Sequence, residues 1–210
     1  MSTIQTYQTI HSPSTGSYSE SGSKFLAFAQ SVNSEQSVRQ LRDLLHKEHH
    51  KAVHVVFASR IGWDEITERS SDDGEPAGSA GKPVLNAMRS FEVTQSVICV
   101  VRYFGGKKLG IPGLIHAYKA AAEDALTHAS LITITLYEKY QASCSMEDMQ
   151  GLLHQLNKAG ARVVDSEFGE NSTFRILIPR AKLEAFHALQ KDMWQTSFTH
   201  LGSTDDARGI

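Results

Sequence analysis

The stretch that decides the fold runs from Ser96 to Tyr118 and reads Ser-Val-Ile-Cys-Val-Val-Arg-Tyr-Phe-Gly-Gly-Lys-Lys-Leu-Gly-Ile-Pro-Gly-Leu-Ile-His-Ala-Tyr. Its first eight residues are mostly β-branched or apolar, which predicts a buried strand over 96–103. Four glycines follow, and glycine at the end of a strand favours a tight turn. From Gly113 to His128 apolar side chains recur at helical spacing, which predicts a helix that packs on a sheet.

The chain has another glycine-rich segment upstream, which we call the first, and the glycine-rich part of 96–118 is the second. The first segment reads Arg69-Ser-Ser-Asp-Asp-Gly-Glu-Pro-Ala-Gly-Ser-Ala-Gly-Lys-Pro83. It follows an apolar run over 51–61 that predicts a strand, and it leads into a short helix over 79–89, whose first turn tolerates Pro83. Both glycine-rich segments hold residues that add little to stability, because glycine loses backbone entropy on folding and unpaired charges gain little from burial. We therefore expect both segments to serve the function of the protein.

The rest of the chain forms two blocks of strands and helices. In the first block, residues 4–10 predict an edge strand or a tail, 12–23 a loop or hairpin connection, and 24–29 a strand. An amphipathic helix follows, capped by Asn33 or Ser34, with Val38, Leu41, Leu44 and Leu45 on its apolar face. In the second block, strands are predicted over 136–143, 161–168, 173–179 and 195–201, and helices over 146–159 and 181–192. This βαββαβ order is typical of a ferredoxin-like domain with both helices on one face of an antiparallel sheet.

We therefore predict an α+β protein of two domains, which a chain of 210 residues can accommodate. Residues 1–15 are expected to form an N-terminal edge strand or tail, and residues 16–130 the first domain. Residues 135–202 are expected to form the ferredoxin-like domain, and residues 203–210 a flexible tail.

The composition excludes several classes of protein. The hydrophobic fraction is 40% and the charged fraction 21%, as in ordinary globular domains, and no apolar run is long enough to span a membrane. A net charge of −2 gives no overall attraction to nucleic acid, so a nucleic-acid surface must be a local basic patch. Cys99 and Cys144 each lie in an apolar run, and the N-terminus lacks the pattern of a secretory signal. We expect a cytoplasmic protein that does not bind membranes.

Common enzyme motifs are absent from the sequence. A phosphate-binding P-loop needs Ser or Thr after Gly81-Lys82, where this chain has Pro83. The glycines of residues 105–110 do not have the spacing of the dinucleotide-binding fingerprint. Neither a Gly-x-Ser-x-Gly elbow nor a His-Glu-x-x-His zinc helix occurs. The sequence therefore favours a protein without catalytic activity.

The second glycine-rich segment has the composition of an anion-binding site. Arg102, Lys107 and Lys108 supply positive charge, and the rings of Tyr103 and Phe104 can stack on nucleic-acid bases. Its glycines keep their amides accessible ahead of a helix N-terminus, which carries partial positive charge. An equally simple interpretation is that the glycines only permit tight turns and that the lysines form a solvated rim.

The first segment is acidic, with Asp72, Asp73 and Glu75. These carboxylates can hold a magnesium ion that bridges to phosphate, because magnesium prefers oxygen ligands, and no other cofactor is suggested. They can equally cap a helix or pair with basic residues, and the sequence favours this second interpretation. The basic residues concerned are Arg69, Lys82 and Lys107.

The candidate catalytic residues of an enzyme of this sequence are the same three carboxylates and His54. His54 lies in an apolar strand, where a histidine bonded to a backbone carbonyl is the simplest expectation.

The two quoted strings resemble the hallmark motifs of the IMPACT/YigZ family. The resemblance covers residues 20–128 as the family's N-terminal domain, and the βαββαβ block is similar to the small C-terminal domain of its bacterial members. Lys24-Phe25 and His54 fall where the family usually has a basic-aromatic pair and a histidine. The resemblance implies a first domain of the left-handed βαβ kind, similar to domain IV of elongation factor G, and a second similar to that factor's ferredoxin-like domain V.

This pairing of domains points to ribosomes or structured RNA. Eukaryotic members of the family regulate translation by competing for the co-activator of the kinase that senses amino-acid starvation, although they carry a different accessory domain. A translation-regulatory protein partner is therefore a second expectation. For the bacterial-type members no established reaction comes with the resemblance.

The chain departs from the family pattern at the start of the predicted helix. The usual Gly-Thr-Gly-Gly-Leu-Val-Arg-Ala-Tyr is here Gly110-Ile-Pro-Gly-Leu-Ile-His-Ala-Tyr118. Pro112 removes one amide donor, and His116 replaces an arginine that is always charged. We expect anion binding at this helix start to be weaker than usual, or pH-dependent.

Three hypotheses about function follow. The leading one is a non-enzymatic RNA- or ribosome-associated protein, a regulator of translation, that binds phosphate through the second glycine-rich segment. The others are a metal-assisted hydrolase or phosphotransferase that uses the acidic segment, and a protein-interaction module in which the glycines are structural. The expected phosphate- or nucleic-acid-binding residues are Lys24, Arg69, Lys82, Arg102, Tyr103, Phe104, Gly105, Gly106, Lys107, Lys108, Gly110, Gly113 and His116.

Overall fold

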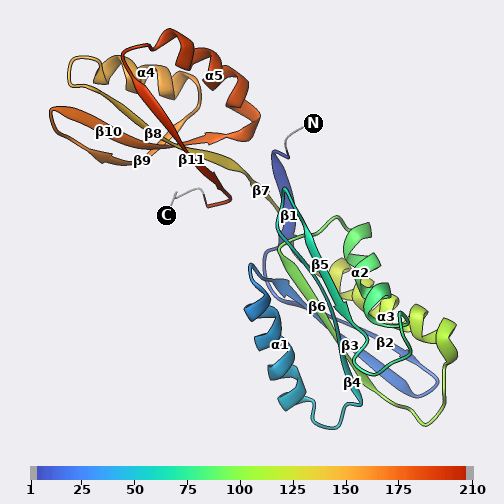
Figure 1. Ribbon diagram of the computed structural model, residues 1–210. Helices are drawn as coiled ribbons and strands as arrows, with labels where there is room; N and C mark the ends of the chain where they lie inside the picture. Colours follow the sequence, from blue (N-terminus) through green and yellow to red (C-terminus); the bar gives the residue numbers. More distant parts are fainter. Residues whose placement is uncertain (1–3, 207–210) are drawn as a thin grey trace. The chain divides into compact units, whose positions relative to one another are not determined.

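The computed structural model describes residues 4–206, which divide into two compact units (Figure 1). Within these residues, the N-terminal unit comprises 8–133 and the C-terminal unit comprises 4–7 with 134–206. The chain passes from one unit to the other in β1 (Thr6–Ile10) and in β7 (Leu131–Thr135), which pair as a two-stranded sheet. The predicted α+β class with two domains is confirmed.

A five-stranded antiparallel sheet forms the centre of the N-terminal unit. Its strands are β2 (Ser14–Glu20), β3 (Ser23–Ser31), β4 (His54–Ile61), β5 (Thr67–Ser71) and β6 (Ser96–Tyr103). The spatial order is β2-β3-β6-β4-β5, so the strand predicted at 96–103 is the central one. Every residue of β6 except the last is buried, because elements pack on both faces of the sheet.

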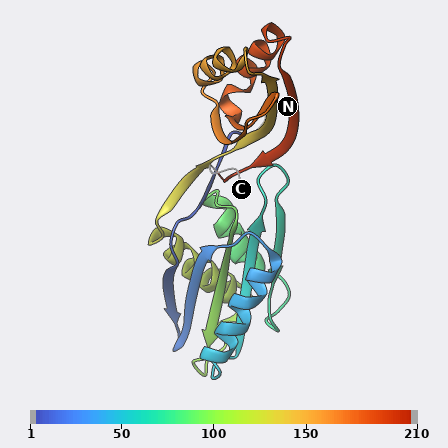
Figure 2. The same ribbon diagram turned by 90° about the vertical axis from the view of Figure 1, so that its left-hand side faces the viewer.

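Three helices cover the two faces of this sheet (Figures 1 and 2). They are α1 (Glu35–Glu48), α2 (Gly81–Ser90) and α3 (Gly110–Thr127). On one face, α2 and α3 pack around the buried rings of Phe25 and Tyr118. On the opposite face, α1 begins at the capping side chain of Ser34 and packs its Leu45 against a cluster that includes Val55.

The C-terminal unit has the predicted βαββαβ order. Its elements are β8 (Tyr137–Ser145), α4 (Met149–Lys158), β9 (Arg162–Glu167), β10 (Asn171–Pro179), a 3-10 turn (Arg180–Lys182), α5 (Leu183–Asp192) and β11 (Ser197–Thr204). The antiparallel sheet has the order β11-β8-β10-β9, and both helices lie on one face of it (Figure 1). Leu152, Phe174 and Phe186 fill the core between sheet and helices. The ferredoxin-like expectation is therefore confirmed.

The sequence pattern did not predict three of the strands, which are β2, β5 and β7. For β2 the structure gives the reason. This strand lies in the serine- and glycine-rich stretch that predicts a loop or hairpin connection. Its composition reflects close packing, because a Cβ atom on Gly16 would lie 2.2 Å from the backbone nitrogen of Ala125 in α3. The other two, β5 and β7, are short strands of five residues each. At the end of the chain, β11 includes residues 203 and 204 of the predicted tail, and 207–210 lie outside the described residues.

The burial of the two cysteines and the character of the helices agree with what the composition predicts. Cys99 and Cys144 are buried and free, and burial raises the pKa of the Cys99 thiol to about 12, so it stays protonated. No helix within residues 4–206 has the length and apolar character needed to cross a membrane.

Candidate functional site

The candidate site forms around Arg102, near the C-terminal end of β6. Arg102 lies opposite Phe25 of β3 and His54 of β4, so the three side chains share one face of the sheet. This is the face that α2 and α3 cover, and Arg102 is only 6% exposed. A buried guanidinium requires an anionic partner, because an unpaired buried charge is very costly.

Glu75, from the first glycine-rich segment, is that partner. Its Oε1 lies 2.5 Å from Nη1 of Arg102 and accepts a second hydrogen bond of 2.7 Å from the hydroxyl of Tyr118 in α3. Nε2 of His54 lies 3.9 Å from the same oxygen. Burial and the bond to Glu75 raise the pKa of Tyr118, so its hydroxyl remains a hydrogen-bond donor. We call these four residues the Glu75 cluster.

Asp72 shapes the segment that delivers Glu75. Its carboxylate accepts backbone hydrogen bonds from Gly78, Ala80 and Gly81, at 2.7, 3.0 and 2.8 Å, and so caps the start of α2. Burial by itself would raise the pKa of Asp72, but the three amides outweigh it and hold this pKa below its usual range. The role of Asp72 is therefore structural.

Asp73 fixes the same segment to the sheet. Its backbone has a φ of +47°, its Oδ2 accepts a 2.7 Å hydrogen bond from the amide of Val55, and its carbonyl accepts one of 2.6 Å from Nδ1 of His54. His54 is thus bonded to a backbone carbonyl, as the sequence suggested. This bond leaves its Nε2 directed toward Glu75.

The three carboxylates of the acidic segment have different partners. Asp72 binds amides, Asp73 binds the edge of β4, and Glu75 binds Arg102 rather than Arg69, Lys82 or Lys107. Among residues 4–206, no three acidic, histidine or cysteine side chains are grouped so as to hold a metal ion. The geometry therefore supports capping and pairing as the role of the segment.

A cavity of about 370 Å³ lies beside the Glu75 cluster. Its apolar lining consists of Pro76, Phe104, Leu109, Ile111 and Leu114, and its polar side chains are Glu75, Arg102 and Lys108. Ligand sites usually have mostly apolar walls with a few placed polar groups, and volumes of roughly 300 to 1,000 Å³. The cavity has this character. The sequence pattern did not predict its apolar wall, because isolated leucine and isoleucine residues beside a glycine turn form no motif.

The residues from Phe104 to Leu109, which we call the basic loop, connect β6 to α3. Lys107 and Lys108 are exposed on it, Phe104 is 47% exposed, and the centroid of its ring lies 5.6 Å from the guanidinium carbon of Arg102. The loop is anchored where the amide of Gly105 donates a 3.1 Å hydrogen bond to Oγ of Ser23. A Cβ atom on Gly105 would lie 2.0 Å from the carbonyl carbon of Gly22, so only glycine fits this approach.

The first turn of α3 lies next to the basic loop and lacks a side-chain cap. Gly110 and Ile111 open the helix, and Pro112, which has no N–H, takes the third position. His116 is exposed, with its ring edge-on to Tyr18 at 5.3 Å between centroids. Of the residues that depart from the family pattern, Ile111 lines the cavity, and Pro112 and His116 follow it in α3.

Of the other expected phosphate-binding residues, the structure brings only some to the basic loop. Lys24 is exposed and lies opposite Tyr103 in the register of β3 and β6. Lys82 is exposed in the first turn of α2. Arg69 lies elsewhere, because β5 pairs only with β4 near the start of β6, and its Nη2 is 2.7 Å from a carboxylate oxygen of Glu35.

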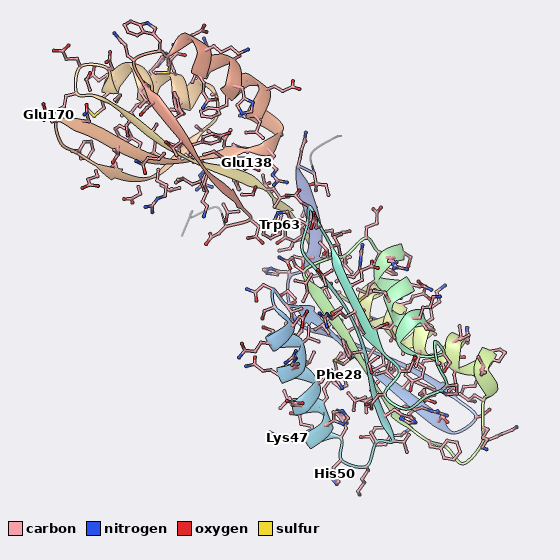
Figure 3. The ribbon with its side chains drawn as sticks, in the orientation of Figure 1. Phe28, Lys47, His50, Trp63, Glu138 and Glu170 are labelled. Atoms are coloured by element: carbon pink, nitrogen blue, oxygen red, sulfur yellow. The ribbon has the colours of Figure 1, made fainter. Side chains whose placement is uncertain are left out.

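A second buried carboxylate–arginine group, unpredicted from the sequence, lies in the C-terminal unit and is formed by Glu138 and Arg180. Figure 3 labels Glu138. Oε1 of Glu138 on β8 accepts hydrogen bonds from Nε of Arg180 at 2.7 Å and from Oγ of Ser203 at 2.8 Å. Its Oε2 lies 2.6 Å from Nε2 of His200. Burial would raise the pKa of Glu138, but these donors together lower it. We call these four residues the Glu138 cluster.

Comparison with known proteins identifies the family. The model of the Impact N-terminal domain matches residues 21–126. The chain is 28% identical over 187 residues to the IMPACT family member YvyE of Bacillus subtilis, covering 89% of this chain and 83% of that protein. It is also 28% identical over 172 residues to the IMPACT family member YigZ of Escherichia coli, covering 81% and 84% of the two chains.

The fold has a counterpart among solved structures. A crystal structure of a hypothetical protein matches with a TM-score of 0.68 and 27% sequence identity, over 95% of this chain and 98% of that one. The match therefore extends over both units. Since the Impact N-terminal domain spans just over half of the 210 residues, the chain belongs to the IMPACT family.

Proposed function

We propose that this protein is a non-enzymatic regulator of translation that binds RNA or the ribosome through the basic loop. The observation that carries the proposal is the exposure of Lys107 and Lys108 beside the exposed ring of Phe104. Neither lysine has an acidic partner within the described part of the chain. Free cations bind backbone phosphates, and an exposed aromatic ring stacks on bases.

The surroundings of the loop add to this character. Lys24 lies across from Tyr103, and α3 presents an uncapped N-terminus, which favours anions. The hydrogen bond from Gly105 to Ser23 anchors the basic loop to the start of β3. Membership of the IMPACT family supports the translational part of the proposal, because the resemblance implies regulation of translation in its eukaryotic members.

The test is sedimentation of the full chain with ribosomes and with bulk RNA across a salt series. We expect wild-type binding to weaken steeply as salt rises, since phosphate contacts release counterions. The double variant Lys107→Glu, Lys108→Glu should bind more weakly and reduce the slope of log K against log salt by about two.

The matched control is Lys158→Glu with Lys191→Glu, which changes the net charge equally at two exposed positions of the C-terminal unit. It should leave binding nearly unchanged. Equal binding by the loop variant and wild type at low salt would contradict the proposal, as would equal losses in the loop variant and the control. In the absence of any RNA binding at low salt, a protein partner becomes the better hypothesis.

A further inference from the structure

The floor of the cavity beside the Glu75 cluster is incompletely bonded. Oε1 of Glu75 receives Arg102 and Tyr118, whereas its Oε2 accepts no hydrogen bond from the residues described. Arg102 donates only from Nη1, and its buried Nε has no partner within residues 4–206. Buried polar groups are almost always hydrogen-bonded in folded proteins. At this floor, Oε2 of Glu75 and Nη2 of Arg102 therefore make no hydrogen bond with the described residues, which leaves one acceptor and one donor group for a ligand.

The charges of the cavity differ between floor and mouth. At the floor, Glu75 and Arg102 neutralise each other, so an anion gains little there. At the mouth, Lys108 and the first turn of α3 at Gly110 and Ile111 supply positive charge. The walls between are apolar, with Phe104 and Ile111 both exposed.

These properties select one kind of ligand. A flat body would pack against the apolar walls, and a neutral edge with a hydrogen-bond donor and an acceptor would match Glu75 and Arg102 at the floor. An anionic group would bind Lys108 and the first turn of α3 at the mouth. An inorganic phosphate has only the last of these, and a fatty acid lacks the polar edge. A nucleotide has all three, because every base carries ring or amino N–H groups beside carbonyl or ring-nitrogen acceptors.

We propose that this cavity binds a single nucleotide, with the base against Phe104, its polar edge on Glu75 and Arg102, and its phosphate at Lys108 and the start of α3. The inference rests on the proposed function and sharpens it, because an unstacked nucleotide of single-stranded RNA supplies the same chemistry as a free nucleotide. Oε2 of Glu75 accepts an N–H of the base, and Arg102 donates to an adjacent acceptor.

The test is calorimetric titration of the full chain with the four nucleoside monophosphates, and with ribose 5-phosphate, which has the phosphate but no base. We expect at least one monophosphate to bind tenfold or more tightly than ribose 5-phosphate. Phe104→Ala, a change at an exposed ring, should weaken that binding about tenfold, as should Glu75→Gln. The control Trp194→Ala removes another exposed ring, in the C-terminal unit, and should leave binding unchanged.

The possible results separate this inference from the proposed function. Monophosphates that bind no better than ribose 5-phosphate, or equal binding by Phe104→Ala and wild type, overturn the nucleotide cavity even where RNA sediments with the protein. Specific monophosphate binding without RNA binding supports the cavity, assigns it to free nucleotides and overturns the proposed function. Loss of both RNA and nucleotide binding in Phe104→Ala places a nucleotide of RNA in the cavity.

Discussion

The two units each bury a carboxylate–arginine pair, but the pairs are completed to different degrees. In the C-terminal unit, both oxygens of Glu138 are bonded, and Arg180 donates from Nε, Nη1 and Nη2. In the N-terminal unit, Glu75 uses one oxygen and Arg102 one nitrogen among the described residues. Both arginines are equally buried, at 6% exposure. The difference therefore lies in how the surrounding groups satisfy them.

This difference separates a structural role from a binding role. A fully bonded buried network stabilises one arrangement of the chain and has no capacity left for a ligand. An incomplete network beside a cavity of about 370 Å³ keeps that capacity. We infer that the Glu138 cluster secures the C-terminal unit, in which Nη1 of Arg180 also binds the carbonyl of Ile4. The Glu75 cluster is the one available for recognition.

The largest expected effect is on the free energy of unfolding, and it tests the contrast between the Glu138 cluster and the Glu75 cluster. Arg180→Met should lower the free energy of unfolding of the C-terminal unit by about 3–5 kcal/mol, because it leaves a buried carboxylate without its main partner. Arg102→Met should cost the N-terminal unit less, since Arg102 donates from Nη1 alone among the described residues, whereas Arg180 donates from Nε, Nη1 and Nη2. Urea unfolding read by pulsed hydrogen exchange and mass spectrometry reports each unit separately. Equal losses in the two variants would contradict the contrast.

The next effect concerns the loop that borders the cavity. Gly105→Ala should destabilise the N-terminal unit by about 1–3 kcal/mol and weaken RNA binding, because the new methyl group overlaps the backbone at Gly22. Gly106→Ala is the matched control. No atom lies within 4 Å of its Cβ, so only the cost of its φ of +85° applies, about 1 kcal/mol. Urea midpoints and RNA sedimentation check both, and a larger loss in Gly106→Ala would show that the close approach is unimportant.

A smaller effect follows from the lowered pKa of Asp72. Its folded pKa lies below the usual value of 3.8, so its stabilising contribution is fully present above that value and is lost as pH falls through the folded pKa. Asp72→Ala should cost about 0.5–2 kcal/mol at pH 7, as the loss of a helix cap does. The gap between variant and wild type should close below the folded pKa. Urea unfolding of the N-terminal unit from pH 7 to pH 2 measures this difference in the free energy of unfolding. A difference that stays constant with pH would contradict the capping role of the Asp72 carboxylate.

The smallest effect is expected at the helix position that departs from the family pattern. His116→Arg places a permanent charge on α3 and should tighten RNA binding two- to fivefold at pH 7, as exposed charges typically do. Sedimentation of the variant and the wild type with RNA at equal salt measures this gain, and equal binding by the two would contradict it.

The sequence was sufficient for the order of most elements and for the identity of the site segments. Apolar periodicity marked β6, α3 and the βαββαβ block, because alternation and helical spacing are local properties of the chain. The glycine-rich strings marked the acidic segment and the basic loop. The same local view failed at β2, where serine and glycine suggested a connection although close packing against α3 required small residues.

The tertiary structure alone decided which of the marked residues meet. Glu75 is 27 residues from Arg102 and 43 from Tyr118, and no local pattern relates positions so far apart. Sheet register set Arg102 beside His54, and the packing of α3 on the sheet brought the hydroxyl of Tyr118 to Glu75. The sequence by itself determined most of the elements and the chemistry that each of them carries. Only the fold decided that Glu75 completes a buried arginine beside a cavity, because contacts between distant segments depend on three-dimensional packing.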